Sequence, residues 1–153
     1  MKEDRVAKAI ALFKEGYNCS QSVVAAFADE YGFTREQALR MAASFGGGIG
    51  RMRETCGAAC GMFLLAGLET GATEGRDREG KAANYALVQE LAEEFKRRNG
   101  ALRCADLLGL SKKEPVISTP EARTEQYYAK RPCVKMVEEA AKIWSEYLEM
   151  HKK

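Results

Sequence analysis

The chain has 153 residues, of which 46% are hydrophobic and 30% charged, a composition typical of a globular protein with a core of its own. Its 24 basic and 22 acidic side chains nearly cancel, so the charge does not favour nucleic acid or an anionic membrane as a partner. No apolar run approaches the ~20 residues of a membrane span, and the charged N-terminus MKEDRVAKAI does not resemble a secretory signal, which predicts a cytoplasmic protein without membrane insertion.

The first part of the chain carries helical periodicity with clear start and stop residues. Apolar residues that recur every three or four positions predict a first helix that ends near Gly16. Asn18 can cap a second helix, which should end at Gly32. Residues 34–37, TREQ, resemble a capping box and predict a short third helix. Residues 44–54, SFGGGIGRMRE, then interrupt the helical pattern.

The middle of the chain predicts its most apolar helix and its longest one. Thr55 is the expected N-cap of an apolar helix that begins at Cys56 and runs to Gly71. The longest helix is expected over about residues 80–98, with an apolar stripe on one face and basic residues at its C-terminal end. The stretch 101–109, ALRCADLLG, predicts a further short helix.

The last part of the chain begins with a connection and ends with a helix. Residues 111–120 are expected to be the connection, and the Thr-Pro pair at 119–120 predicts a short helix over residues 121–128. Pro132 opens the last helix. Because no strand-like alternation competes, residues 1–153 are predicted to form a single all-α domain, a bundle of about six to seven helices with short connections.

The functional interpretation depends on cysteine. The five cysteines are Cys19, Cys56, Cys60, Cys104 and Cys133. An odd number without a signal peptide argues against an extracellular disulfide framework, and a reducing compartment keeps such thiols reduced. The single histidine, His151, lies near the C-terminal end, which disfavours a Cys–His hydrolase and zinc sites of mixed histidine and cysteine ligands. The cysteines are therefore either buried residues of the core or reactive thiols.

Three of these cysteines, Cys19, Cys56 and Cys133, fall at predicted helix starts. The first turn of a helix has free N–H groups and about half a positive charge, which favour thiolate over thiol. Such a position can lower a cysteine pKa from about 8.5 towards 7 or below. Basic residues shortly before Cys56 and Cys133 would act in the same direction. The alternative for any one of them is a buried cysteine that behaves as a small hydrophobe.

Glycines surround the second cysteine. Gly57 and Gly61 lie four residues apart on one face of the predicted helix, where each costs roughly 0.5–1 kcal/mol relative to alanine. Close helix packing would explain them, and so would the close approach of a cofactor. The run GGGIG lacks the lysine and hydroxyl of a P-loop and no strand precedes it. Its glycines are instead expected to give the chain a tight, irregular entry into the Cys56 helix, and also to expose N–H groups towards an anionic centre. We therefore take Gly47, Gly48, Gly57 and Arg51 as candidate cofactor contacts.

A family resemblance rests on the order of the cysteines. The motif Cys56-Gly57-Ala58-Ala59-Cys60-Gly61 follows Cys19 in GYNCSQSV and the run GGGIG, and it precedes Cys104 in RCADLLG and Cys133 in RPCVKMV. Over about residues 5–145, the chain thus resembles the C_GCAxxG_C_C family of redox-active proteins, named for four cysteines and a CGAxxG motif. The resemblance implies redox activity for these four cysteines, without naming a substrate. Cys60 occupies a variable motif position and does not readily satisfy disulfide geometry with Cys56, so we treat it as an additional thiol.

Thiol redox chemistry is the first functional hypothesis. Cys56 would be the nucleophile, Cys19 or Cys133 would resolve it as a disulfide, and the remaining thiols would relay reducing equivalents. Such a protein would need a separate redox partner, either a reductase or a small-molecule electron carrier.

Two other hypotheses use the same residues differently. Cys19, Cys56, Cys104 and Cys133 could together bind an iron–sulfur cluster or another metal centre, although structural zinc is disfavoured because close CxxC pairs are absent. A helical interaction module without chemistry is the third hypothesis. In that case Trp144 and Tyr147 of the last helix would face a second copy of the chain in a homodimer.

Overall fold

Residues 2–110 and 116–151, the residues that the computed structural model describes, form an all-α fold, as the sequence predicts. The α-helices are α1 (Lys2–Lys14), α2 (Cys19–Phe27), α3 (Arg35–Ala42), α4 (Gly57–Thr70), α5 (Arg78–Asn99), α6 (Cys104–Leu108), α7 (Glu125–Lys130) and α8 (Cys133–Met150). Short 3₁₀ helices, Ala28–Tyr31 and Ala43–Phe45, extend α2 and α3. These eight α-helices exceed the expected six to seven because both short segments, α6 and α7, are helical. None of the helices in these ranges has both the length and the apolarity that a membrane crossing requires.

Helix starts agree with the sequence at α2 and α3 and differ at α4 and α7. Asn18 and Thr34 both form capping boxes, as expected. Cys56 rather than Thr55 is the N-cap of α4, because the Thr55 backbone forms an antiparallel bridge with Arg103. The helix expected over residues 121–128 begins only after Thr124, whose hydroxyl accepts the first capping hydrogen bond. The connection expected over residues 111–120 lies partly outside the described residues.

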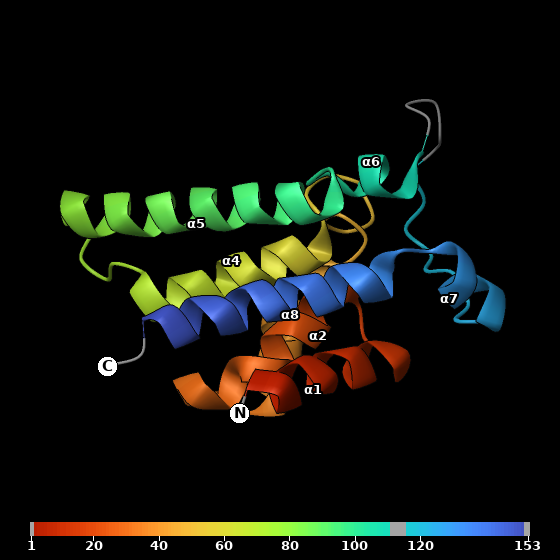
Figure 1. Cartoon of the computed structure of the whole chain (residues 1–153), viewed down its shortest axis with the longest axis horizontal. Helices are drawn as coiled ribbons and strands as arrows, with labels where there is room; N and C mark the ends of the chain where they lie inside the picture. Colours follow the sequence, from red (N-terminus) through yellow and green to blue (C-terminus); the bar gives the residue numbers. More distant parts are fainter. Residues whose placement is uncertain (1, 111–115, 152–153) are drawn as a thin grey trace.

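The helices form layers around α4 and α8. Figure 1 shows these two helices side by side in the middle of the molecule, with α5 along one side and α1 and α2 on the other. Both α4 and α8 begin at the end of the molecule where α6 and α7 lie (Figure 1). The largest fully buried side chains between the layers include Phe13, Phe27, Met62, Phe95 and Trp144. The core therefore fills the space between the layers, and the starts of α4 and α8 lie at one end of the bundle.

Two glycines let α2 and α4 approach closely. A Cβ atom built on Gly61 would lie 2.8 Å from the Cβ of Val23, and one on Gly57 would lie 3.3 Å from the Cβ of Cys19. A Cβ on Gly57 would also lie 2.8 Å from the carbonyl oxygen of Phe45. Real Cβ atoms do not occupy such positions in close-packed interiors. Helix packing, one of the two explanations that the sequence offered, is confirmed for both glycines.

The last helix does not offer its tryptophan to a second subunit. Trp144 is fully buried within the chain, and its ring stacks on Tyr147 with 5.0 Å between ring centroids. The expectation that Trp144 faces a second copy of the chain is therefore wrong, because its own bundle already covers the side chain. The expected homodimer receives no support from this residue.

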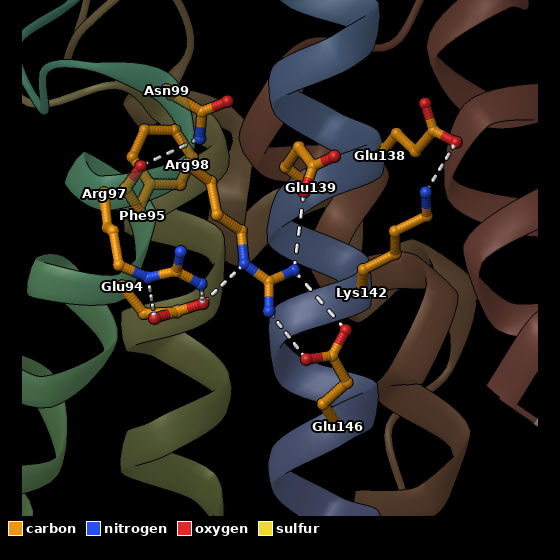
Figure 2. A network of polar contacts seen from close by, with 9 residues as sticks. All are labelled: Glu94, Phe95, Arg97, Arg98, Asn99, Glu138, Glu139, Lys142 and Glu146. Atoms are coloured by element: carbon orange, nitrogen blue, oxygen red, sulfur yellow. Dashed lines mark hydrogen bonds and ion pairs between the residues drawn. The ribbon is translucent and has the colours of Figure 1, made fainter.

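An arginine at the end of α5 ties this helix to α8. The Arg98 guanidinium contacts Glu94 of its own helix at 2.6 Å and Glu146 of α8 at 2.6 Å (Figure 2). It also reaches Glu139 at 3.4 Å, and the Arg98 and Glu139 side chains are only 19% and 20% exposed. Solvent therefore screens these pairs less than it screens a surface pair. The network fixes the outer helix against the middle layer.

Substituting the packing glycine should separate α2 from α4. We expect Gly61→Ala to lower the free energy of unfolding by about 1–3 kcal/mol, because the new methyl group overlaps the rigid β-branched Val23. The measurement is urea unfolding followed by circular dichroism. Gly67→Ala is the matched control in the same helix, since nothing lies within 4 Å of its added Cβ. That variant should gain about 0.5–1 kcal/mol, and equal effects of the two changes would contradict the packing role.

Candidate functional site

The four cysteines of the motif meet at one end of the bundle, each at the start of a helix. Cys19, Cys104 and Cys133 are the first residues of α2, α6 and α8, and Cys56 is the N-cap of α4. All four line one cavity of about 390 Å³. The expected helix-start positions of Cys19, Cys56 and Cys133 are confirmed, and Cys104 adds a fourth. The fold thus brings together cysteines that are far apart in the sequence, which the thiol hypothesis requires.

Backbone pairing brings Cys104 beside Cys56. The Cys56 N–H donates to the carbonyl of Leu102 at 2.8 Å, and the Cys104 N–H donates to the carbonyl of Glu54 at 2.6 Å. These bonds flank the Thr55–Arg103 bridge and join the segment before α4 to the segment before α6. Because the pairing consists of backbone hydrogen bonds, it fixes the two helix starts relative to each other.

The glycine run packs against this joint. A Cβ atom on Gly48 would lie only 2.6 Å from the Cβ of Cys104, and Gly48 has a φ of +78°. A side chain is therefore excluded here both by the contact and by the left-handed backbone. Gly47, Gly48, Gly57 and Arg51, the expected cofactor contacts, all line the cavity. The structure assigns the two glycines Gly48 and Gly57 a packing role beside the thiols.

A segment before α7 closes one side of the cavity. Arg51 donates hydrogen bonds to the carbonyl oxygens of Ile117, at 2.7 Å, and Thr119. Arg123 donates to the carbonyl oxygens of Phe13 at 2.8 Å and Tyr17 at 2.9 Å, at the end of α1. We call residues 116–124 the strap. Its residues at 118, 120 and 121 line the cavity, so it forms part of the wall around the thiols.

Cys133 has the lowest pKa of the cysteines in the cavity. A hydrogen bond from the neighbouring Cys19 thiol, the positive charge of Arg131 and a hydrogen bond from the Tyr127 hydroxyl lower its pKa to about 7. The same contact with Cys133, together with burial, raises the pKa of Cys19 well above its ordinary value. Cys133 is partly exposed, whereas Cys19 is buried. The two thiols therefore titrate as a pair, in which Cys133 loses its proton before Cys19.

Cys56 and Cys104 are protonated thiols despite their positions at helix starts. Burial raises the pKa of Cys56 to about 12, although the N–H groups of Ala58 and Ala59 oppose the shift. Burial also raises the pKa of Cys104, against the effect of Arg53, whose guanidinium donates to the Cys104 sulfur at 3.6 Å. Burial therefore acts against the lowered pKa that the sequence predicts for Cys56. Arg53 is one of the basic residues shortly before Cys56, and in the structure it lowers the pKa of Cys104 instead.

Cys60 is separate from these four thiols. It does not line the cavity formed by residues in the described ranges, and its sulfur lies 3.8 Å from the carbonyl oxygen of Thr55. Burial raises its pKa to about 11. Its position one turn into α4 agrees with its treatment as an additional thiol.

A metal centre is the second use that the four thiols could serve. Within residues 2–110 and 116–151, no three His, Cys, Asp or Glu side chains lie in an arrangement that could hold a metal ion. The four cysteines line the cavity wall without converging on one point at ligand distance. An iron–sulfur cluster spaces its thiolate ligands around several metal atoms, so Cys19, Cys56, Cys104 and Cys133, which line one cavity, are the residues that would hold such a cluster.

Sequence reasoning missed the contribution of the segment before Cys133. Tyr127 and Arg123 line the cavity beside Cys133, and the expected helix over residues 121–128 gave them no role there. A signal was present in the sequence, since EARTEQYYAKRPC places basic and phenolic residues shortly before a cysteine. Arginine and tyrosine are hydrogen-bond donors that stabilise a nearby thiolate.

Comparison with known proteins agrees with this cysteine arrangement. A family model described as "Putative redox-active protein (C_GCAxxG_C_C)" matches residues 17–147, a range that contains all four cysteines of the cavity. No curated protein and no solved structure matches the chain. Because the family match covers most of the sequence, the chain belongs to the C_GCAxxG_C_C family, and redox activity is the function that this family description indicates.

Proposed function

We propose that the chain is a thiol–disulfide redox protein in which the Cys133 thiolate attacks and the Cys19 thiol resolves. The observation that carries this proposal is that these two thiols, from opposite ends of the sequence, begin α2 and α8 and line one cavity, where each has the largest effect on the other's pKa. A pair with one thiolate and one thiol is what disulfide exchange requires.

Exposure supports the order of attack. Cys133 is the one partly exposed cysteine of the cavity among the described residues, so an electrophile from solvent reaches it before Cys19, Cys56 or Cys104. Its sulfur lies at the start of the 18-residue helix α8, next to Arg131 and Tyr127. Each of these neighbours stabilises negative charge on the sulfur.

The reaction transfers two electrons to a disulfide substrate. The Cys133 thiolate attacks one substrate sulfur, the substrate S–S bond breaks, and the other half leaves as a thiolate. The Cys133 sulfur is now part of a mixed disulfide and no longer carries the negative charge to which the Cys19 thiol donated. The Cys19 proton therefore passes to the departing thiolate. The Cys19 sulfur then attacks Cys133, which forms the Cys19–Cys133 disulfide and releases the second half as a thiolate. An external dithiol, a reductase or a small molecule, returns the protein to its reduced form.

Cys56 and Cys104 have a different place in this scheme. Both line the same cavity and both are protonated at neutral pH, so neither begins the reaction. We assign them the relay, in which the Cys19–Cys133 disulfide passes to them by exchange before the external reductant acts. A cytoplasmic protein would find such a reductant in the surrounding dithiol pool.

Mild oxidation should join the two ends of the chain. Treating the reduced protein with one equivalent of a small disulfide is expected to produce a Cys19–Cys133 linkage, detected by peptide mass spectrometry without reduction. Cys60→Ser should leave this linkage intact, since Cys60 lies outside the cavity. Iron, zinc and sulfide are measured on the same protein purified without oxygen. A stoichiometric iron–sulfur cluster, or a linkage that never includes Cys133, would contradict the proposal.

The alkylation rate of Cys133 should depend on pH around neutrality. Because the thiolate is the reactive form, the rate with iodoacetamide is expected to rise through pH 7 and level off above it, following the pKa of about 7. Cys19→Ala removes the hydrogen-bond donor that lowers the pKa of Cys133 most, so the midpoint should move up, towards the value of an ordinary cysteine of about 8.5. Peptide mass spectrometry measures the rate at each pH.

The matched control for this titration is Cys60→Ala. It removes a thiol of the same size that makes no contact with Cys133, and the midpoint should stay where it is. A midpoint that is unchanged in Cys19→Ala would show that the two sulfur groups do not interact in solution.

A further inference from the structure

Positive charge is concentrated around the thiols. Four arginines line the cavity, and among the described residues Glu121 is the one acidic side chain that lines it. The arginines are Arg51, Arg53, Arg123 and Arg131. Arg131 pairs with Glu121 in a salt bridge. Even with Cys133 ionised, the cavity retains an excess of positive charge, in a chain whose overall net charge is only +2.

Two of the four arginines are available to bind a substrate. Both terminal nitrogens of Arg123 donate to carbonyl oxygens at the end of α1, whereas Arg51 and Arg53 each use one terminal nitrogen in the contacts described above. Arg51 and Arg53 carry five N–H donors each, more than their contacts with the strap carbonyls and the Cys104 sulfur use. Burial and the positive charges of Arg53 and Arg131 lower the pKa of Arg51. An anion placed between these groups would relieve this repulsion.

The cavity has the size of a small-molecule site. Its volume of about 390 Å³ lies within the range of roughly 300–1,000 Å³ that is typical of ligand pockets. Strap residues 118, 120 and 121 form part of its wall, so the sulfur atoms do not stand on an open protein surface. This geometry favours a small disulfide over an exposed disulfide of another protein.

We propose that the cavity takes small disulfides that carry carboxylates, with Arg51 and Arg53 binding a carboxylate while Cys133 attacks the sulfur. This inference rests on the proposed function and names its substrate class. The substrate disulfide gains two electrons and leaves as one thiol and one thiolate, and the protein keeps the Cys19–Cys133 disulfide. Arginine suits this role because its planar group donates two parallel hydrogen bonds to a carboxylate.

Paired alkylating reagents test the anion preference without any redox step. Iodoacetate and iodoacetamide share a leaving group and differ in charge, and their rates at Cys133 are compared in the folded and the urea-unfolded chain. We expect the ratio of the iodoacetate rate to the iodoacetamide rate to be about tenfold higher in the folded chain, and to fall as salt is added. A ratio that does not rise on folding would overturn the inference.

Variants of the arginines distinguish charge from structure. Arg51→Met and Arg53→Met should each lower the iodoacetate preference several-fold. Arg51→Lys should retain most of it, because the charge remains even though the strap contacts change. Arg97→Met removes the same charge from the exposed face of α5, away from the cavity, and should leave the preference unchanged. A loss as large in Arg97→Met would mean that net charge alone is responsible.

Three disulfides of similar size extend the test to the reaction. Dithiodiglycolate, hydroxyethyl disulfide and cystamine are anionic, neutral and cationic, and each is mixed with the reduced protein. We expect the rate of Cys19–Cys133 formation to be greatest with dithiodiglycolate and smallest with cystamine. Formation at equal rates would overturn the anion preference and leave the proposed function standing. Absence of the linkage with all three would overturn the proposed function, whereas the alkylation ratio would still report on the anion site.

Discussion

The close approach of α2 and α4 is the constraint on which the site depends. Gly57 and Gly61 replace side chains that would collide with α2 and with the loop before α4, and the start of α2 can therefore lie directly against the start of α4. Cys19 and Cys56 are at these two positions. The other two cysteines are then added by separate means, Cys104 by backbone pairing and Cys133 by the packing of α8 on α1, α2 and α4. Moving Cys19 away from Cys56 would therefore open the part of the cavity wall beside which Cys104 and Cys133 lie.

A helix start alone does not decide the charge of a thiol in this protein. All four cysteines have that position, yet the pKa of Cys133 is lowered and that of Cys56 is raised to about 12. The helix dipole contributes about 0.3–1 kcal/mol in ordinary cases, whereas full burial can shift a pKa by up to about 3–5 units, at about 1.4 kcal/mol per unit. Burial therefore prevails at Cys56. At Cys133, partial exposure weakens the burial effect, and the Cys19 thiol, Arg131 and Tyr127 add three stabilising contacts.

Local signals in the sequence were sufficient for most of the fold and for the choice of cysteines. The capping boxes at Asn18 and Thr34 depend on residues within one turn, so the sequence pattern contains all their information. The start of α4 could not be placed in this way, because Thr55 is withdrawn from the helix by pairing with Arg103, far along the chain. The different pKa values of Cys56 and Cys133 could not be predicted for the same reason. Burial and the contact between Cys19 and Cys133 are tertiary properties, and no spacing of residues near Cys56 contains them.

Backbone strain gives separate support for a role of the two cavity arginines. Arg51 and Arg53 have φ angles of 62° and 64°, in the left-handed region that glycine and asparagine adopt at low cost. For another L-residue this conformation costs roughly 1–2 kcal/mol. The same loop carries glycine in this region at Gly47, Gly48 and Gly50, and a third non-glycine residue, Ile49, at a φ of 66°. Contacts of the two guanidinium groups offset this backbone cost. Arg51 donates to the strap, and Arg53 donates to the Cys104 sulfur. Strain of this kind is concentrated at functional sites, where side-chain chemistry is worth more than the local stability that it costs.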